Sequence, residues 1–153
     1  MRTPAGDAFS YFAIGVIRLS AQLEAAGDAL ARPAGQSSAR WLVLAAVEDE
    51  PTTVAQVARR LGLARQSVQR VADILEREGL AAYDENPGHR RARLLRLTAR
   101  GRDVLRSIQA AQRQWADELG ARLGERDLRK AATTLERARA ALAGRTRPSR
   151  RGS

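Results

Sequence analysis

A chain of 153 residues suffices for one domain with helical extensions, and such a chain buries about two thirds of the surface that its unfolded form exposes. Its formal net charge is +10, carried almost wholly by arginine, because Lys130 is the only lysine. The guanidinium fork matches phosphate oxygens and guanine edges, so this surplus favours a polyanionic partner, although a GC-biased genome that encodes Arg in place of Lys would account for part of it.

The residue types that are missing exclude several classes of protein. The absence of cysteine excludes disulfide scaffolds, thiol redox sensing and Cys-ligated zinc. His89 is the only histidine, so a His-rich metal site is excluded as well, and no cofactor is expected. The chain has no signal-peptide pattern and no apolar run of the roughly 18 residues that a membrane span needs. We therefore expect a cytoplasmic protein with no membrane partner.

The first predicted element is a long helix that begins at about Ala8, after a frayed start over Met1 to Asp7, and ends at the breaker Arg32 to Gly35. Its apolar residues alternate by three and four, as in a helix seam: Phe9, Phe12, Val16, Leu19, Leu23, Ala26 and Leu30. The stripe fits a core helix inside one subunit or a subunit interface. We favour the interface, because a helix this long and this apolar needs more than one neighbour.

Two helices are predicted next, and the second of them opens a helix-turn-helix. Ser37 or Ser38 can cap the first of them. Thr53 and Gln56 match a capping box, which predicts that the following helix starts there. Gly62 stands where a residue in the left-handed conformation ends a helix, and a further amphipathic helix comes after it.

That further helix is predicted from about Arg65 to Glu78, with Gly79 ending it and Leu80 folding back on Leu75. Its polar face carries residues spaced by three and four: Arg65, Gln66, Gln69, Arg70 and Asp73. A polar helix face is usually only solvated. However, Gln pairs with adenine and Arg with guanine through two hydrogen bonds each, so we interpret this face as one that reads bases in the major groove.

A basic hairpin is predicted after this helix. The runs Leu80 to Tyr83 and Leu94 to Leu97 are short enough for paired strands, and the turn signal Asn86-Pro87-Gly88 lies between them. Four arginines without an intervening acid follow the turn: Arg90, Arg91, Arg93 and Arg96. The segment is either a solvated basic loop or a wing that lies on phosphates or enters the minor groove, and its position after the helix-turn-helix favours the wing.

Two more helices are predicted toward the C-terminus. Thr98 can cap the first, whose apolar stripe comprises Val104, Leu105, Ile108, Ala111, Trp115, Leu119 and Leu123. Glu125 and Asp127 suit the first turn of the second helix, and Gly144 is expected to close it. The apolar side of this last helix comprises Leu128, Ala131, Ala132, Leu135, Ala138 and Leu142. Residues 145–153 are expected to form a disordered basic tail.

Three stretches carry a resemblance to a known family. They are Val57-Ala58-Arg59-Arg60-Leu61-Gly62-Leu63, Leu75-Glu76-Arg77-Glu78-Gly79-Leu80, and the segment from Arg90-Arg91-Ala92 to Leu97-Thr98-Ala99-Arg100-Gly101. Together with the long leading helix, they make the chain resemble the multiple-antibiotic-resistance regulator (MarR) family over about Phe9 to Leu142. The resemblance implies a mainly α fold, a winged helix-turn-helix with a two-stranded β wing, flanked by N- and C-terminal dimerisation helices.

The resemblance also implies an organisation and a function. Residues 1–35 would be an N-terminal dimerisation helix, residues 36–101 the DNA-binding domain, and residues 102–144 the C-terminal dimerisation helices. An obligate homodimer would bind a pseudo-palindromic double-stranded DNA operator, usually as a repressor, and a small aromatic effector would release it. The chain departs from the family's wing pattern, because Gly88 stands where a wing-tip arginine is common, and Arg90 is the candidate to replace that arginine.

The candidate functional residues follow from these patterns. Those expected to contact DNA are Arg65, Gln66, Ser67, Gln69, Arg70, Arg90, Arg91 and Arg93. Those placed at an effector pocket by the resemblance are Phe12, Arg40 and Trp41, of which the two aromatic residues are equally suited to filling the core.

Two rival functions are weaker. A nonspecific architectural DNA-binding protein would need basic faces all round, whereas acids at Glu48 to Glu50 and Glu76 to Glu85 interrupt the charge. An enzyme is not expected, because the sequence has no Gly-rich phosphate loop, no nucleophile elbow and no cluster of metal ligands.

Overall fold

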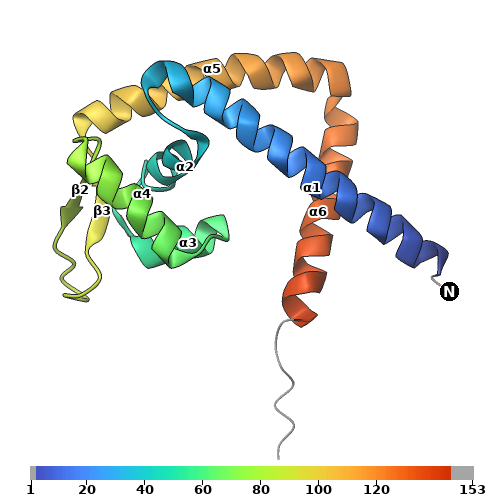
Figure 1. The fold of residues 1–153 in the computed structure, drawn as a ribbon, viewed down its shortest axis with the longest axis horizontal. Helices are drawn as coiled ribbons and strands as arrows, with labels where there is room; N and C mark the ends of the chain where they lie inside the picture. The colour runs from blue at the N-terminus through green and yellow to red at the C-terminus, as the bar shows by residue number, and fades with distance from the viewer. Residues whose placement is uncertain (1–2, 146–153) are drawn as a thin grey trace, which may run out of the picture. The chain divides into compact units, whose positions relative to one another are not determined.

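The computed structural model describes residues 3–145, which are mainly helical and contain one small sheet (Figure 1). The chain divides after Ala111 into two compact units. The first contains α1 (Pro4–Ala31), η1 (Arg32–Ala34), α2 (Ser38–Ala46), β1 (Thr52–Thr53), α3 (Val54–Leu61), α4 (Arg65–Arg77), β2 (Ala81–Asp84), β3 (Leu94–Leu97) and the start of α5 (Ala99–Leu123). The second contains the rest of α5 and α6 (Glu125–Arg145). No helix among residues 3–145 combines the length and the apolar character that a membrane crossing requires.

The predicted mainly α, winged helix-turn-helix fold is confirmed, but the sheet has three strands where the sequence predicted two. Its antiparallel strands follow the order β1-β3-β2. Leu94 pairs with Asp84 of β2, and Leu95 pairs with Thr52 of β1. A strand of two residues is too short to show the alternation by which strands are detected in a sequence. Thr53, predicted only as a helix cap, belongs both to this strand and to the cap.

The helix-turn-helix is built by the local signals that the sequence carries. Thr53 Oγ1 accepts a hydrogen bond from Gln56 N at 3.2 Å, and Gln56 Oε1 accepts one from Thr53 N at 3.0 Å, which completes the predicted capping box. Gly62 ends α3 with φ +66°. Gly79 ends α4 with φ +72°, and the N–H of Leu80 donates to the carbonyl of Leu75 at 2.9 Å. These bonds fix where α4 starts and stops.

The structure corrects the predicted ends of two helices. α1 begins at Pro4 and not at Ala8, because Thr3 Oγ1 accepts the N–H of Gly6 at 3.1 Å and proline fits the first turn of a helix. Gly144 does not close the last helix, since α6 continues to Arg145. A glycine in a helix costs about 1 kcal/mol relative to alanine, which does not end a helix by itself. Arg145 is therefore helical, and the rest of the predicted tail lies outside the described residues.

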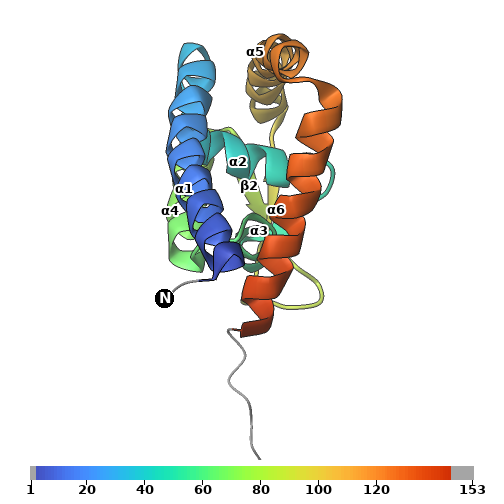
Figure 2. The ribbon, with the colours of Figure 1, turned by 90° about the vertical axis from the view of Figure 1, so that its right-hand side faces the viewer.

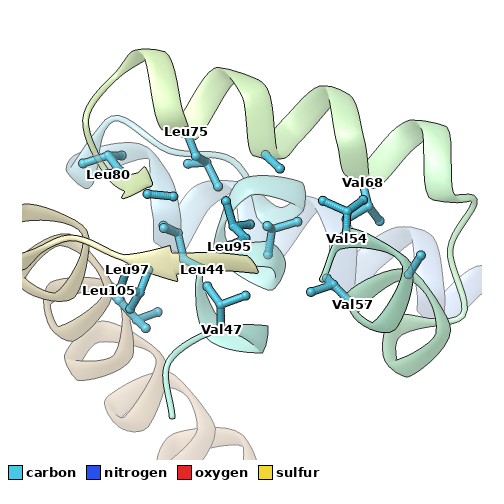
Figure 3. Packing of buried hydrophobic residues seen from close by; sticks show 14 residues of the cluster. Leu44, Val47, Val54, Val57, Val68, Leu75, Leu80, Leu95, Leu97 and Leu105 are labelled. Atoms are coloured by element: carbon cyan, nitrogen blue, oxygen red, sulfur yellow. The ribbon is translucent and has the colours of Figure 1, made fainter. Parts of the chain in front are cut away.

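The core of the first unit lies between α2, α3, α4, the sheet and the start of α5 (Figure 3). Its largest fully buried side chains include Leu44 of α2, Leu75 of α4, Leu95 and Leu97 of β3, and Leu105 of α5. Trp41 and Tyr83 are partly buried and pack against this cluster. Each element of the helix-turn-helix and of the wing is therefore attached to one apolar centre.

α1 is one uninterrupted helix whose C-terminal end packs on α2, whereas its N-terminal half extends away from the α2–α4 body (Figures 1 and 2). At the packed end, Asp28 Oδ1 accepts a hydrogen bond from the N–H of Ser38 at 2.7 Å. Gly27 leaves room for this contact, since a Cβ there would lie 2.7 Å from Ser38 Oγ. Large apolar side chains of α1 are exposed: Phe9, Tyr11, Ile14, Val16, Ile17, Leu19 and Leu23.

The start of α5 is held against the turn between α4 and β2. Thr98 Oγ1 donates to the carbonyl of Gly79 at 2.7 Å and accepts the N–H of Gly101 at 3.0 Å, as a helix cap does. The N–H of Thr98 donates to the carbonyl of Leu80 at 3.1 Å. Gly101 approaches this carbonyl so closely that a Cβ there would lie 1.9 Å from the Leu80 oxygen. Only glycine fits at this position.

Replacing Gly101 with alanine is expected to destabilise the fold. The new methyl group would strike the Leu80 carbonyl, and relieving the overlap requires a backbone shift, for which about 1–3 kcal/mol or more is typical. Urea unfolding followed by circular dichroism measures this change. The control is Gly120→Ala, also in α5, where nothing lies within 4 Å of the added Cβ and helix propensity favours alanine by about 1 kcal/mol. Equal stabilities for the two variants would contradict the steric explanation.

Candidate nucleic-acid interface

α4 presents its polar face outward because its opposite face is buried. Val68, Ala72 and Leu75 lie in the core at helical spacing, which leaves the side chains between them at the surface. The N-cap residue Ala64 offers no side-chain oxygen to the first turn of α4. The N–H groups at this end therefore lack a side-chain cap and can bond an external acceptor, for which phosphate is well suited.

Four of the five DNA-contact residues predicted on α4 lie on this surface. Arg65, Gln66, Ser67 and Arg70 are exposed, whereas Gln69 is only partly exposed. The difference arises because Gln69 faces the sheet and makes side-chain contacts there, described next. Gln66 and Arg70, one helical turn apart, form the most accessible Gln–Arg pair of the helix.

Gln69, Asp73 and Tyr83 form a closed set of hydrogen bonds, hereafter the Gln69–Asp73–Tyr83 network. Gln69 Nε2 donates to Asp73 Oδ1 and to the Tyr83 hydroxyl, both at 2.8 Å. The Tyr83 hydroxyl donates to Asp73 Oδ1 at 3.0 Å. Since Gln69 and Asp73 belong to α4 and Tyr83 to β2, the network joins the outward helix to the first strand of the wing.

The surroundings of Tyr83 favour its neutral phenol. The pKa of Tyr83 is raised from 10.0 to about 12, above all by burial and then by the hydrogen bond to Asp73 and the negative charge of that carboxylate. The guanidinium carbon of Arg93 lies over the Tyr83 ring, 4.7 Å from its centre. Arg93 Nη2 also donates to the Tyr83 carbonyl at 3.4 Å. Arg93 is therefore held on the outer face of β2.

The wing turn between β2 and β3 is ordered by Asn86. Its Oδ1 accepts the N–H of Gly88 at 3.2 Å, and its Nδ2 donates to the carbonyl of Ala92 at 2.9 Å. These bonds close the turn around a backbone that projects Arg90 and Arg91 into solvent, where both are exposed. The fourth predicted wing arginine, Arg96, points elsewhere and pairs with Asp84 at 2.7 Å.

An open cleft of about 290 Å³ lies between α4 and the wing. It is lined by side chains of both elements and brings together four of the predicted DNA-contact residues: Arg65, Gln69, Arg91 and Arg93. Arg90 lies beside a second hollow, which it shares with Arg93. Gln66, Ser67 and Arg70 line neither hollow.

The arginines of this surface belong to the majority of the described arginines that form no ion pair with a carboxylate. Within residues 3–145, the arginines that pair with a carboxylate are Arg40, Arg60, Arg96, Arg106, Arg129 and Arg139. The interface arginines, defined as Arg65, Arg70, Arg90, Arg91 and Arg93, are not among them. Their charge is therefore available to an external anion, and they are distributed over α4 and the wing.

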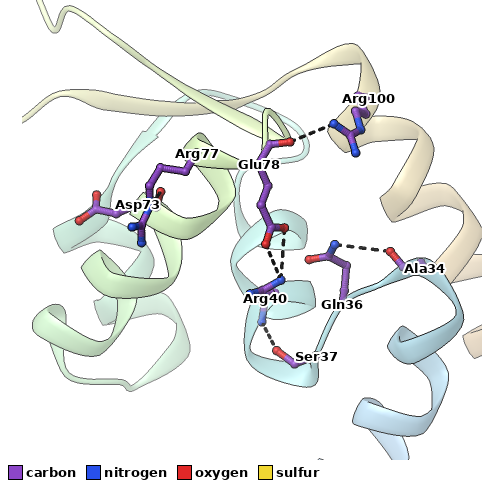
Figure 4. Close-up of polar contacts among 8 residues, drawn as sticks. All are labelled: Ala34, Gln36, Ser37, Arg40, Asp73, Arg77, Glu78 and Arg100. Atoms are coloured by element: carbon purple, nitrogen blue, oxygen red, sulfur yellow. Dashed lines mark hydrogen bonds and ion pairs between the residues drawn. The ribbon is translucent and has the colours of Figure 1, made fainter.

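The residues predicted at an effector pocket have structural contacts of their own, and Figure 4 shows those of Arg40. Arg40 Nη1 donates to both carboxylate oxygens of Glu78, at 3.0 and 3.2 Å, and links α2 to the end of α4. Trp41 packs on the core, and the Phe12 ring lies 6.3 Å from that of Phe9. A carboxylate ligand of Arg40 would have to compete with Glu78. Within the described residues, no group of three or more His, Asp or Glu side chains could hold a metal ion.

The sequence did not reveal the role of Tyr83. It lies in a short strand, and neither its spacing nor its neighbours in sequence indicate a partner on α4. Asp73 was identified on the polar face of α4, but its engagement by Gln69 and Tyr83 depends on the placement of β2 beside that helix.

Comparison of the sequence with known proteins finds a match to one family model over part of the chain. Residues 35–92 match the sequence model of the MarR family. The chain is also 47% identical over 93 residues to the uncharacterized protein Rv2011c of Mycobacterium tuberculosis and, equally, to Mb2034c of Mycobacterium bovis. These matches cover 61% of this chain and 65% of each relative. The chain thus spans slightly less than two thirds of the length of the curated relatives it matches.

Comparison of the fold with solved structures agrees with this match. The MarR family transcription regulator SP03579 aligns with a TM-score of 0.79 at 22% identity, over 90% of this chain and 94% of that one. The transcriptional regulator MosR of M. tuberculosis, in complex with DNA, aligns with a TM-score of 0.71 at 26% identity, over 85% and 96%. CouR from Rhodococcus jostii, bound to p-coumaroyl-CoA, aligns with a TM-score of 0.73 at 20% identity, over 82% and 89%. These likenesses confirm the winged-helix fold.

Tyr83 is expected to lose its proton only near pH 12 in the folded chain. Its raised pKa means that its contribution to stability is complete below pH 10 and is lost as the pH rises through about 12. The measurement is the ultraviolet absorbance of phenolate in a Tyr11→Phe variant, whose remaining tyrosine is Tyr83, with circular dichroism monitoring the fold. Asp73→Asn should lower the midpoint, because it removes the charge that disfavours phenolate. A midpoint near 10 in the folded Tyr11→Phe variant would contradict the buried, hydrogen-bonded phenol.

Proposed function

We propose that this chain, a winged helix-turn-helix protein of the MarR family, binds double-stranded DNA through α4 and the wing and regulates transcription. The family and the solved structures that the chain resembles are transcription regulators rather than enzymes. MosR, at 26% identity, was crystallised in complex with DNA, and CouR is described as a repressor bound to a DNA duplex. The observation that carries the proposal is the set of five interface arginines without a carboxylate partner, spread over α4 and the wing.

The proposed contacts divide by the chemistry of the side chains. Gln66 and Arg70, exposed in the N-terminal half of α4, would read base edges in the major groove. Arg65 and Ser67 would contact phosphates beside the uncapped helix end. Phosphate contacts of this kind set the register of the helix, whereas the base contacts set the sequence preference.

The wing arginines would act mainly on the DNA backbone. Arg90 and Arg91 project from a turn that Asn86 orders, and both are exposed. Arg90 is proposed to take the place of the wing-tip arginine that Gly88 replaces. Arginines in such a position neutralise phosphates or enter the minor groove, and the affinity that they provide falls as salt is added.

A homodimer is proposed to be the binding species. Phe9, Leu19 and Leu23 are each about half exposed, at 49%, 50% and 48%, on one side of α1, and such a stripe is large for a surface that stays in water. Leu128 of α6, in the second unit, is 40% exposed as well. A two-fold dimer would cover these residues and present two copies of α4 to half-sites about one helical turn of DNA apart, roughly 34–36 Å. The operator would then be pseudo-palindromic.

We further propose that the chain represses transcription and that a small effector releases it from DNA. CouR is described bound to p-coumaroyl-CoA and bound to a DNA duplex. For this chain we propose a small aromatic acid as the ligand class. The candidate residues remain Phe12, Arg40 and Trp41. Because Arg40 is bonded to Glu78, the ligand carboxylate would replace that contact and loosen α2 from the end of α4. Cytoplasmic location likewise stays a prediction.

The rival function is nonspecific, architectural DNA binding. Acids interrupt the positive charge of the described residues, because Glu50, Glu78 and Asp84 pair with arginines outside the interface set. A protein whose outward helix carries the exposed Gln66 is better suited to reading one site. Competition between a selected duplex and a scrambled duplex distinguishes the two functions.

Removing the wing charges should weaken binding to every duplex. In an Arg90→Ala, Arg91→Ala double variant, the salt slope of the binding constant should shrink by about 0.9 for each phosphate that the wing no longer neutralises. The measurement is fluorescence anisotropy at several salt concentrations. It uses one duplex that the wild-type chain has selected from a random pool and a scrambled duplex of the same composition. An unchanged slope would show that the wing does not touch DNA.

Gln66→Ala provides the contrast for this experiment. Removing a base-reading side chain should cost about 1–3 kcal/mol on the selected duplex and little on the scrambled one, with a relaxed preference at one base pair. The same decrease on both duplexes would assign Gln66 to phosphate contact.

Charging the apolar stripe of α1 should separate the subunits. Leu19→Asp would bury an unpaired carboxylate in the proposed dimer, which is strongly unfavourable, so a monomer or an unfolded chain with weak, nonspecific DNA binding is expected. Light scattering gives the molecular mass. Ala21→Asp, an exposed position on the opposite side of α1, should leave the dimer intact. If the wild-type chain were monomeric and still bound its selected duplex tightly, the proposed dimer would be wrong.

A further inference from the structure

We propose that the Gln69–Asp73–Tyr83 network sets the position of the wing relative to α4, and that Gln69 acts in it as a positioning residue instead of reading a base. This inference rests on the proposed function, because it assigns roles within the same DNA-binding surface. It departs from the spacing of α4, which groups Gln69 with Gln66 and Arg70 as base-contacting residues.

The donors and acceptors of the network match one another. An amide nitrogen has two hydrogens, and Gln69 Nε2 donates one to Asp73 Oδ1 and the other to the Tyr83 hydroxyl. The Tyr83 hydroxyl has one hydrogen, which it donates to Asp73. Because an ionised carboxylate only accepts, the amide must present its nitrogen, and not its oxygen, to Asp73. Every hydrogen of the network is therefore in use.

Reading a base would require a different set of bonds from Gln69. Paired recognition of adenine needs one amide N–H for N7 and the amide oxygen for the N6 amino group. Gln69 could offer that N–H only by giving up its bond to Asp73 or to Tyr83, which would weaken the network. Gln66 is free to bond a base, since it is exposed and its side chain has no hydrogen bond within the described residues. The two glutamines of α4 therefore have different roles.

Tyr83 connects the network to the wing because of its place in the chain. Gln69 and Asp73 are one turn apart on α4, so a bond between them does not connect α4 to another element. Tyr83 lies in β2, immediately before the residues that form the wing turn. Its hydroxyl is the part of the network that connects α4 to the wing, and its ring carries the guanidinium of Arg93.

The geometry thus places three arginines around one fixed ring. Arg65 of α4 and Arg91 and Arg93 of the wing line the same cleft, with Gln69, Asp73 and Tyr83 in its wall. A duplex that contacts helix and wing at once needs these charges at a set spacing, and ordering them before binding avoids an entropic cost during binding. The network supplies that order without touching a base.

The decisive variant is Tyr83→Phe, which removes the hydroxyl and keeps the ring beneath Arg93. We expect binding to fall by up to about tenfold, the range of one or two neutral hydrogen bonds, by the same factor on a wild-type-selected duplex and on a scrambled one. The salt slope should shrink because the wing then neutralises fewer phosphates. Gln69→Ala should act in the same direction and leave base preference unchanged. The double variant should be no weaker than Tyr83→Phe alone, since both act through one network.

Tyr11→Phe is the matched control, because it makes the same chemical change at a residue that is 84% exposed on α1. Base reading by Gln69 predicts the opposite pattern. Gln69→Ala would then relax preference at one base pair of the selected duplex, and Tyr83→Phe would leave affinity unchanged or increase it by freeing the amide. Either result would overturn the positioning role.

Amide hydrogen exchange without DNA separates this inference from the proposed function. Tyr83→Phe should speed exchange in β2, the wing turn and β3, and leave the amides of α1 as they are in the wild-type chain. Unchanged exchange in the wing, or equal acceleration throughout the chain, would reject the network as a positioning device. If the wild-type chain bound no duplex, the proposed function would be wrong, and the exchange experiment would still decide whether the network holds the wing.

Discussion

The contact of α5 with the turn between α4 and β2 is the constraint on which the first unit depends. At Gly79 and Leu80 the chain leaves α4 and enters β2, and the start of α5 returns to the same carbonyls through Thr98 and Gly101. These contacts hold α4, the wing and α5 together at one point of the backbone. A close approach between backbone segments is stiff, because it leaves no side chain to rearrange. A large side chain at Gly101 would disturb all three elements together.

Some charged residues of the first unit connect its elements through ion pairs, and others are left without a carboxylate partner. Acids hold the framework: Glu78 receives Arg40 of α2 through its carboxylate and Arg100 of α5 through its carbonyl, and Asp84 pairs with Arg96 across the sheet. These pairs are partly exposed, so each contributes little to stability. The interface arginines form no such pair and are shared between α4 and the wing. The net charge of +10 is less informative than this separation, since the charge alone is compatible with any polyanion.

α4 serves three purposes with two faces. Its apolar face packs in the core through Val68 and Leu75. On its polar face, Gln66 and Arg70 are exposed, whereas Gln69 and Asp73 bond the Tyr83 hydroxyl and so reach the wing. A helix that is attached both to the core and to the wing can hold its exposed side chains at a fixed angle, which is what recognition of a rigid duplex requires. The neutral phenol of Tyr83 suits this role, because it can donate to Asp73 throughout the physiological pH range.

The sequence by itself determined the order of the elements and most of their ends, because the signals involved act over three to five residues. Each of these signals predicts a local conformation that the structure has. They are the capping box at Thr53, the left-handed glycines at positions 62 and 79, and the apolar spacing of α4. Its two errors at helix ends are of the same local kind, since Thr3 caps earlier and Gly144 breaks less than expected. The tertiary structure decided what depends on residues far apart in the chain. The pairing of Thr52 with Leu95, the closeness of Gly101 to Leu80 and the turn of Gln69 toward Tyr83 have no local signature. Spacing on a helix shows which side chains share a face, but the bond that each one makes is set by the strand or helix that packing brings beside it.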